Sequence, residues 1–207
     1  LYNRNVTDKE STKKDSYKLG FALAQVNKMF IISQAEGRLI LTDQHAAHER
    51  VVLENIKRNY GNNKVIRQVL LIPKIIKIGK EKKIILDSKR QIEKIGIIFE
   101  DYGENDLLVR EIPAILGKIN VQHLFDDILE KIKIIGRIES SSPKIEEIFS
   151  SVACHNSIRA GRKLNIEEMN ALLRLMEKTP NAGQCNHGRP TFIELSFNDL
   201  ERMFGRI

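Results

Sequence analysis

Residues 42–54 have the sequence Thr-Asp-Gln-His-Ala-Ala-His-Glu-Arg-Val-Val-Leu-Glu. The apolar run 39–41 in front of them predicts a buried strand, and the residues from His45 onward show the spacing of a helix. Asp43 then stands at the end of the strand. His45 and Glu49 are four positions apart and share one face of the helix. This short stretch therefore combines groups that bind metal ions and transfer protons.

The length and charge of the chain set broad limits. The 207 residues are enough for one large domain or two small ones. Because the first residue is leucine rather than methionine, we expect a piece of a longer protein, in which residues 1–17 are the end of a solvated linker. No apolar run approaches the roughly 18 residues that span a bilayer, and no signal peptide is evident. The net charge of +7 favours an anionic partner, although solvated edges of amphipathic elements explain it equally well.

The elements around this stretch predict a mixed α/β fold of the α+β class. Strands are expected at 19–26, 29–33 and 38–42, followed by the helix that ends near 60–63. Residues 67–136 contain a strand at 68–73 closed by a proline, a helix at 80–94, a hairpin with strands 97–102 and 107–112, and a helix from 121 to 135.

The remaining segment adds two helices and a strand. A helix capped by Ser142 is expected to run to Gly161, and a second to run from Asn165 to Thr179. A strand at 191–197 is followed by a final helical turn capped by Asn198 with Glu201. We expect two subdomains: a discontinuous one formed by 18–66 plus 137–207, and a small α/β subdomain, 67–136, inserted into it.

Metal-binding side chains are concentrated in three segments, 43–49, 154–155 and 185–187, which hold four of the five histidines and both cysteines. His45 and Glu49 offer a nitrogen and an oxygen ligand, and Cys154 offers a thiolate. Cys185 and His187 offer a sulfur and a nitrogen, and their side chains point the same way if the tripeptide 185–187 is extended. Such mixed donors suit Zn²⁺, and the carboxylates leave room for Mn²⁺ or Mg²⁺. Alone, a His-x-x-x-Glu pair is more typical of a surface helix, a single cysteine in an apolar helix is usually a small core residue, and Cys-x-His is too short to decide. A disulfide between the two cysteines is possible but little favoured.

Taken together, these segments resemble the C-terminal domain of the MutL family of DNA mismatch-repair proteins, in its endonuclease-bearing branch. The resemblance covers nearly everything after the linker. It is carried by Asp43-Gln44-His45-Ala46 with Glu49 and Glu54, by Ala153-Cys154, by Cys185-Asn186-His187-Gly188-Arg189-Pro190 and by Phe204-Gly205-Arg206. Two positions depart from the family pattern. His155 replaces an arginine or lysine, which either removes a cation near the site or adds another possible ligand. Asn186 replaces a proline and is expected to loosen its loop.

The resemblance implies a metal-dependent endonuclease that nicks one strand of double-stranded DNA. It implies Zn²⁺ and Mn²⁺, with Mg²⁺ as an alternative, held by His45, Glu49, Cys154, Cys185 and His187. Asp43 and Glu49 would be the catalytic residues. Four further side chains would support the site without binding the metal: Glu54, His155, Arg189 and Arg206.

The resemblance also implies partners. The chain would form a homodimer through the early strands and the two helices after 143. Gln68, Leu70, Leu71, Ile72 and Pro73 would dock on the β sliding clamp, whereas without the resemblance 68–73 is simply an edge strand. Contact with the mismatch-recognition protein MutS, and ATP bound at an N-terminal region, would belong to the full-length protein, which we expect in the cytoplasm with the nucleoid and without a membrane partner.

Two other functions are compatible with the sequence. One is a non-catalytic dimerisation and protein-docking module with a structural zinc, as in some members of the family. The other is a metal-responsive DNA-binding domain, which the basic charge favours but which lacks an evident recognition helix. Asp43 favours the enzyme, because a structural zinc site has no need of that residue.

Overall fold

The computed structural model describes residues 17–62, 64–135, 144–155 and 162–206 of the chain. Its contacts divide the chain into two compact units, which are described separately: unit 1 comprises Leu1–His48 and Ile158–Ile207, and unit 2 comprises Glu49–Ser157. Helices and sheets are mixed, so the predicted α+β class is confirmed. None of the described helices is long and apolar enough to cross a membrane.

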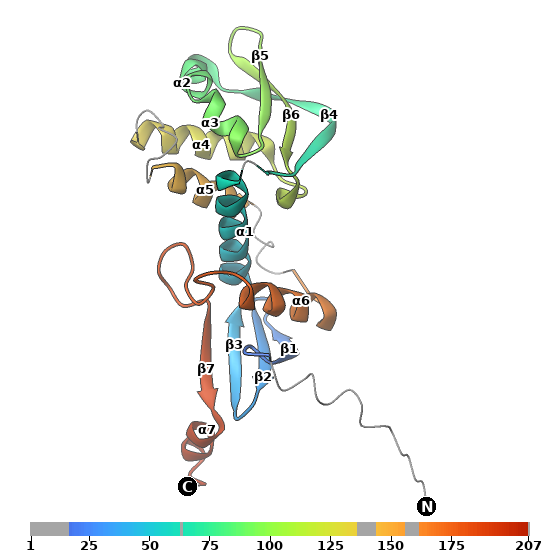
Figure 1. Cartoon of the computed structure of the whole chain (residues 1–207), viewed down its shortest axis with the longest axis vertical. Coiled ribbons are helices and arrows are strands. Elements are labelled where there is room, and N and C mark those ends of the chain that lie inside the picture. The colour runs from blue at the N-terminus through green and yellow to red at the C-terminus, as the bar shows by residue number, and fades with distance from the viewer. Residues whose placement is uncertain (1–16, 63, 136–143, 156–161, 207) are drawn as a thin grey trace, which may run out of the picture. The chain divides into compact units, whose positions relative to one another are not determined.

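Unit 1 is built on a four-stranded antiparallel sheet in the order β1-β2-β3-β7 (Figure 1). Its strands are β1 (Phe21–Val26), β2 (Phe30–Ala35), β3 (Arg38–Asp43) and β7 (Phe192–Ser196), which confirms the four strands predicted here. Asn27 and Lys28 both have positive φ, 50° and 52°, in the short turn between β1 and β2. This conformation matches the twist of the two strands and allows the tight hairpin.

Helix α6 (Ile166–Glu177) packs on this sheet. Its predicted start is confirmed by a capping box, in which the Asn165 side chain accepts from the backbone of Glu168 and the Glu168 side chain accepts from the backbone of Asn165. The helix buries Met169, Leu172, Leu173 and Met176. Asn170 ties it to β1, because its Oδ1 accepts from the Ala22 backbone N–H at 2.9 Å.

Helix α7 (Phe197–Met203) follows β7 directly, and the cap predicted for it is wrong. Ser196, the last residue of the strand, is the N-cap, and its Oγ accepts from the Asp199 backbone N–H at 3.0 Å. Asn198 lies inside the helix, because the chain turns as soon as β7 ends.

Unit 2 contains a second antiparallel sheet, in the order β4-β6-β5, and most of the helices. The strands are β4 (Arg67–Lys77), β5 (Ile98–Tyr102) and β6 (Asp106–Pro113). The helical elements are α1 (Gln44–Gly61) from Glu49 onward, η2 (Gly79–Glu81), α2 (Lys82–Asp87), α3 (Lys89–Lys94), η3 (Ala114–Leu116), α4 (Val121–Ile135) and α5 (Lys144–His155). The predicted hairpin and the predicted helix at α4 are confirmed.

The division into units follows contacts, and it falls within α1. Segment 67–136 lies entirely in unit 2, together with the greater part of α1 and with α5. The subdomain boundaries that we expected at 66–67 and 136–137 stay a prediction. Residues 1–16, the connector 136–143 with the Ser142 cap, and the helix end at Gly161 lie outside the described residues.

The single helix predicted at 80–94 is wrong, because the chain is interrupted at Ser88. The Ser88 backbone N–H donates to Ile85, which ends α2, and its carbonyl accepts from Gln91 and Ile92 at the start of α3. One residue therefore terminates one short helix and opens the next.

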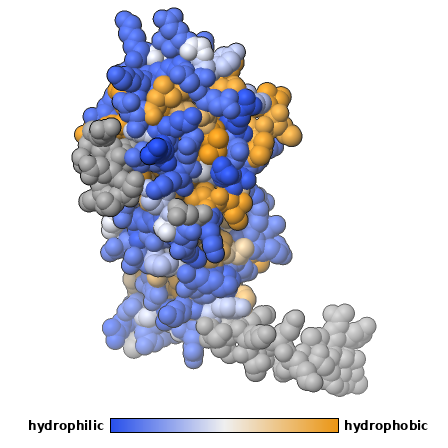
Figure 2. Space-filling model, turned by 45° about the horizontal axis from the view of Figure 1, so that its top comes forward, coloured by the Kyte–Doolittle hydropathy of each residue, from blue (hydrophilic) through white to orange (hydrophobic). Residues whose placement is uncertain are grey.

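Strand β4 continues past Pro73, contrary to the prediction. Val69 pairs with Glu111 and Lys74 pairs with Val109, so residues 70–73 oppose a single residue of β6 and form a bulge. A proline is tolerated at a bulge because no ladder hydrogen bond is required of it there. The bulge exposes Leu71 fully, at 102%, and Ile72 at 73%, and Val69 beside it is 68% exposed. Figure 2 shows hydrophobic side chains at the protein surface among mainly hydrophilic ones.

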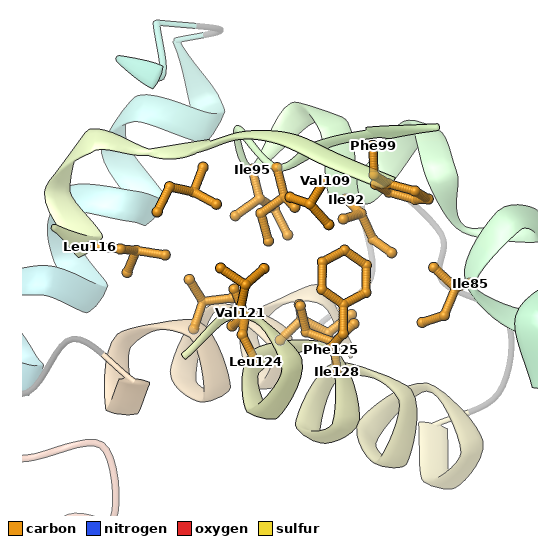
Figure 3. Close-up of a cluster of buried hydrophobic side chains, with 14 of the residues drawn as sticks. Ile85, Ile92, Ile95, Phe99, Val109, Leu116, Val121, Leu124, Phe125 and Ile128 are labelled. Carbon is orange, nitrogen blue, oxygen red and sulfur yellow. The ribbon is translucent and has the colours of Figure 1, made fainter. Parts of the chain in front are cut away.

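The core of unit 2 lies between its sheet and its helices (Figure 3). Phe125 of α4 and Phe99 of β5 meet edge to face, with ring centroids 5.5 Å apart, and both are fully buried. Glu49 stands on the same helix as Val52 and Ile56, which are buried in this core. The apolar face of α1 therefore fixes the helix in unit 2, as its spacing predicted.

Candidate metal and nuclease site

Asp43 connects the central strand of unit 1 to α1. Its Oδ1 accepts from the backbone N–H groups of His45 at 2.9 Å and Ala46 at 3.0 Å, so the side chain caps the helix. Its own backbone N–H donates to the Thr191 carbonyl at 2.8 Å, immediately before β7. The carboxylate is therefore held in one position relative to the first turn of α1, at the strand end where the sequence placed it.

Gln44 has a role that sequence reasoning missed. It is almost fully buried, and its Oε1 accepts from the Gln25 side chain at 2.5 Å. Both amides donate to the Arg162 carbonyl, and Gln25 Oε1 accepts from the Leu164 backbone N–H at 3.0 Å. This pair of amides, of which Gln44 is the buried member, connects residues 162–164 to the start of α1. The position of Gln44 directly after a predicted buried strand could have indicated this role. A polar side chain that is buried there needs hydrogen-bond partners.

Two histidines lie on the part of α1 that belongs to unit 1. His45 is half-buried in the first turn, one helical turn before Glu49. His48 has a pKa lowered to about 4, mainly because burial removes water from the charged ring and also because His45 and Arg162 are close. Its Nδ1 is buried without a hydrogen-bond partner in the described structure. His48 is therefore neutral near pH 7.

Cys185 and His187 are held in a tight turn. The Cys185 backbone N–H donates to the Arg189 carbonyl at 2.7 Å, its carbonyl accepts from Gly188 at 3.1 Å, and its Sγ accepts from the His187 backbone N–H at 3.4 Å. Residues 185–187 thus form a turn and are not extended. The extended backbone that would point the Cys185 and His187 side chains in the same direction is therefore absent here. Cys185 is buried and His187 is exposed. Asn186 stands in a turn that these hydrogen bonds close.

Glu49 and Cys154 come into contact inside unit 2. Glu49 is 6% exposed, and its carboxylate accepts a hydrogen bond from the Cys154 thiol. The pKa of Cys154 is raised to about 12, chiefly because the protein around the sulfur removes water from a thiolate and then because of the negative charge of Glu49. Part of the side chain still reaches solvent, and both cysteines are free thiols. A cation bound here would oppose this shift.

Glu54 is engaged elsewhere on α1. Its Oε1 pairs with the Arg50 guanidinium at 2.8 Å, one turn back along the helix, and both side chains are largely buried. The contact agrees with a supporting role rather than a metal-binding one for Glu54.

The five predicted ligands are divided between the units: His45, Cys185 and His187 belong to unit 1, and Glu49 and Cys154 belong to unit 2. Across the described parts of the chain, no three His, Cys, Asp or Glu side chains gather as a group able to hold an ion. The chemistry of the donors, two thiols with two imidazoles and a carboxylate, is the chemistry that Zn²⁺ selects. Arg189 and Arg206 are exposed, and the side chain of His155 lies outside the described residues.

Comparison with known proteins assigns a family. Residues 23–164 match the family model described as the MutL C terminal dimerisation domain. The chain is 49% identical over 199 residues to a DNA mismatch repair protein MutL of Rickettsia bellii, covering 95% of this chain and 33% of that protein. It is 48% identical over 204 residues to the MutL of Rickettsia peacockii, covering 98% of this chain. The chain thus spans about a third of the length of these relatives.

Replacing Asp43 tests its structural role separately from any catalytic one. Asp43→Ala removes the cap of α1 and is expected to lower the free energy of unfolding by about 1 kcal/mol. Asp43→Asn keeps an oxygen that can accept both N–H groups and should stay within about 0.5 kcal/mol of the wild type. Urea unfolding followed by circular dichroism measures both, with Glu36→Ala in an exposed turn as the control. An Asp43→Ala protein as stable as the control would show that the Asp43 side chain does not stabilise α1.

Proposed function

Because the chain belongs to the MutL C-terminal dimerisation domain family, we propose that it acts in DNA mismatch repair as a dimer of two copies that nicks one strand of double-stranded DNA with the help of bound metal ions. The contact between Glu49 and Cys154 supports the proposal most directly. It joins two motifs that are distant in the sequence, and both residues are ligands in the proposed site.

The proposed ligands are His45, Glu49, Cys154, Cys185 and His187, with Zn²⁺ and Mn²⁺ or Mg²⁺ as the ions. When bound, these ions would polarise the scissile phosphodiester and lower the pKa of a water molecule. Cys154 would bind a metal ion as a thiolate, and the hydrogen bond from its thiol to the Glu49 carboxylate brings these two donors together. Asp43 would orient the attacking water, because its carboxylate is fixed against the first turn of α1.

Double-stranded DNA as the substrate agrees with the charge of the chain. The net charge is +7, and the exposed Arg189 and Arg206 stand in the two motifs near the C-terminus. Arginine side chains position a duplex by contacting its phosphates. These contacts carry little sequence information, as suits an enzyme that nicks wherever repair is needed.

The bulge in β4 is the proposed docking segment for the β sliding clamp. Gln68 and Leu71 are exposed, and Leu70 packs partly against the core of unit 2. Leu70 therefore anchors the segment to unit 2, while Gln68 and Leu71 remain free to contact a partner. Ile72 and Pro73 complete the segment outside the ladder. Apolar side chains presented on an edge strand fit a hydrophobic groove on a partner.

The rest of the full-length protein would supply further functions. We assign ATP binding and contact with MutS to regions beyond this chain, because the chain covers only 33% of its relatives. The full-length protein would work in the cytoplasm, at the nucleoid.

A dimerisation and protein-docking module with a structural zinc is the second candidate. One observation favours it: Asp43 caps α1, which gives this residue a structural use that does not require catalysis. The two candidates differ in whether the negative charge of Asp43 is needed.

Zinc binding is tested with Cys185→Ser and His187→Ala, each of which removes one donor. We expect the wild-type chain to retain zinc through purification, and each variant to bind it at least about tenfold more weakly. Atomic absorption and competition with a chelating dye provide the measurement. His123→Ala, an exposed histidine of α4, is the control. A Cys185→Ser protein with wild-type zinc affinity would exclude this ligand set.

Nicking is tested on supercoiled plasmid with Mn²⁺, using both this chain and the full-length protein. Asp43→Asn should lower the nicking rate at least about 100-fold, because it removes the charge while the cap remains. Glu36→Gln, an exposed acid in a turn, is the control. Equal nicking by Asp43→Asn would rule out the proposed role of Asp43. A zinc-loaded wild type that leaves the plasmid closed would favour the docking module.

Clamp docking is tested by surface plasmon resonance with immobilised β clamp. The double substitution Gln68→Ala with Leu71→Ala should weaken binding at least about tenfold, because it removes the exposed anchors of the segment. Ile134→Ala truncates an apolar side chain of α4 that is 69% exposed and serves as the matched control. If the double variant and the control bind equally well, the docking segment lies elsewhere.

A further inference from the structure

The positive charge of the chain is concentrated in one segment of unit 2. Residues 64–94 hold ten lysines and arginines against three acids, so the segment has a net charge of +7. The whole chain also has a net charge of +7, so the residues outside this segment sum to zero. A surplus this local indicates a charged surface at a particular place, because a general bias of composition would spread it along the chain.

Helices α2 and α3, with η2 in front of them, place part of this charge on one face. Ile85 and Ile92 are fully buried on the inner side, and the hydrogen bonds of Ser88 connect one helix directly to the next. The outer side carries residues three or four positions apart, which therefore share a face. All of them are exposed, and in chain order they are Lys80, Lys83, Asp87, Arg90 and Lys94. We call Lys80, Lys83, Arg90 and Lys94 the basic stripe.

The chain at the start of β4 adds positive charge at one end of the basic stripe. Gly96, two residues after Lys94, has no room for a side chain, because a Cβ there would lie 2.6 Å from a carbon of Val65 and 3.4 Å from a carbon of Arg67. The start of β4 therefore packs directly against the end of α3. Lys64, the neighbour of Val65, is exposed and extends the positive surface beyond the helices.

The basic stripe differs from its neighbours in having no partner of opposite charge. Lys82 is buried, and its Nζ donates to the Gly103 carbonyl at 2.8 Å. Lys89 pairs with Glu93 at 3.7 Å. Within the described parts of the chain, no ion pair joins a member of the basic stripe to an acid. Like charges three or four positions apart destabilise a helix, so the arrangement favours an anionic partner that neutralises them.

The length and residue types of the basic stripe fit a nucleic acid duplex. The stripe runs over fourteen positions, or roughly 20 Å at the rise of a helix. One DNA strand advances about 3.4 Å per nucleotide, so this length follows about six phosphates. Three of the four members are lysines, which attract phosphates as point charges and do not read the edges of bases. Contacts of this kind hold DNA of any sequence.

We propose that the basic stripe of unit 2 binds the phosphates of double-stranded DNA without regard to sequence. The inference rests on the DNA binding included in the proposed function, and it names a surface built from residues other than the proposed metal ligands. Unit 2 would thus hold the duplex even where no metal ion is bound. Four phosphate contacts predict that the logarithm of the association constant falls with the logarithm of the salt concentration with a slope of about −3.6.

The test measures binding of the whole chain to labelled DNA duplexes of two unrelated sequences by fluorescence anisotropy, over a range of salt concentrations and without added Mn²⁺ or Mg²⁺. Lys83→Gln with Lys94→Gln removes two charges of the stripe. This variant should raise the dissociation constant at least about tenfold for both sequences and make the salt slope shallower by about 2. Lys118→Gln with Lys178→Gln lowers the net charge equally at exposed positions elsewhere and should stay within about threefold of the wild type.

Asp87→Lys provides a second variant with the opposite expectation. It replaces the acid on the face of the stripe with a cation at the last position of α2, where a positive charge suits the helix dipole. Binding should become at least about threefold tighter and the salt slope steeper by about 1.

Circular dichroism establishes that each variant is folded, and Asp87→Lys decides if the stripe variant does not fold. A folded stripe variant that binds DNA as tightly as its control overturns the proposed surface, as does a wild-type chain that binds neither duplex at low salt. Tighter binding of the wild type to phosphatidylglycerol vesicles than to DNA would assign the stripe to a membrane surface and overturn the proposal as well. Nicking is measured separately with Mn²⁺, so DNA binding that depends on the stripe remains distinguishable from a failure of the proposed catalysis.

Discussion

One carboxylate oxygen, which accepts hydrogen bonds from two backbone N–H groups, determines how the chain leaves the sheet of unit 1 and enters α1. Asp43 Oδ1 binds the N–H groups of His45 and Ala46, which fixes where β3 ends and α1 begins. The cap therefore orients the side chains of the first turn of α1, including His45 and Gln44. The buried amide of Gln44 also binds residues 162–164. The residue proposed for catalysis is thus also a structural one, so its charge and its hydrogen bonding have to be separated by isosteric substitution.

Each unit holds its own share of the proposed ligands in a local arrangement. Within unit 1, three hydrogen bonds close the turn that carries Cys185 and His187. Within unit 2, Glu49 is buried beside the Cys154 thiol, whose pKa is raised. Local hydrogen bonds and burial fix these side chains, and such ordering would lower the entropy cost of binding an ion in the proposed site. The partly buried His48 is neutral near pH 7, so it adds no positive charge beside His45.

Two groups of apolar side chains that are not fully buried lie on surfaces of different shape. In β4 they lie on an edge strand, where a bulge removes residues 70–73 from the ladder and leaves Leu71 in solvent. This geometry suits insertion of a short segment into a groove. In unit 1 they form a regular row across β2, β3 and β7, and a flat sheet face of this kind suits packing against another sheet. The two surfaces therefore need not compete for one partner.

The sequence by itself determined the elements whose signal is local. Apolar runs and, at 191–197, alternation predicted the strands of unit 1. Helical spacing placed His45 and Glu49 on one face of α1, and the apolar stripe after Asn165 predicted α6, because such periodicity depends on residues only a few positions apart. The tertiary structure decided what depends on distant partners. Pairing with β6 carries β4 through Pro73, contacts with Gln25 and Arg162 make Gln44 a buried anchor, and the packing of α5 beside α1 joins Cys154 to Glu49.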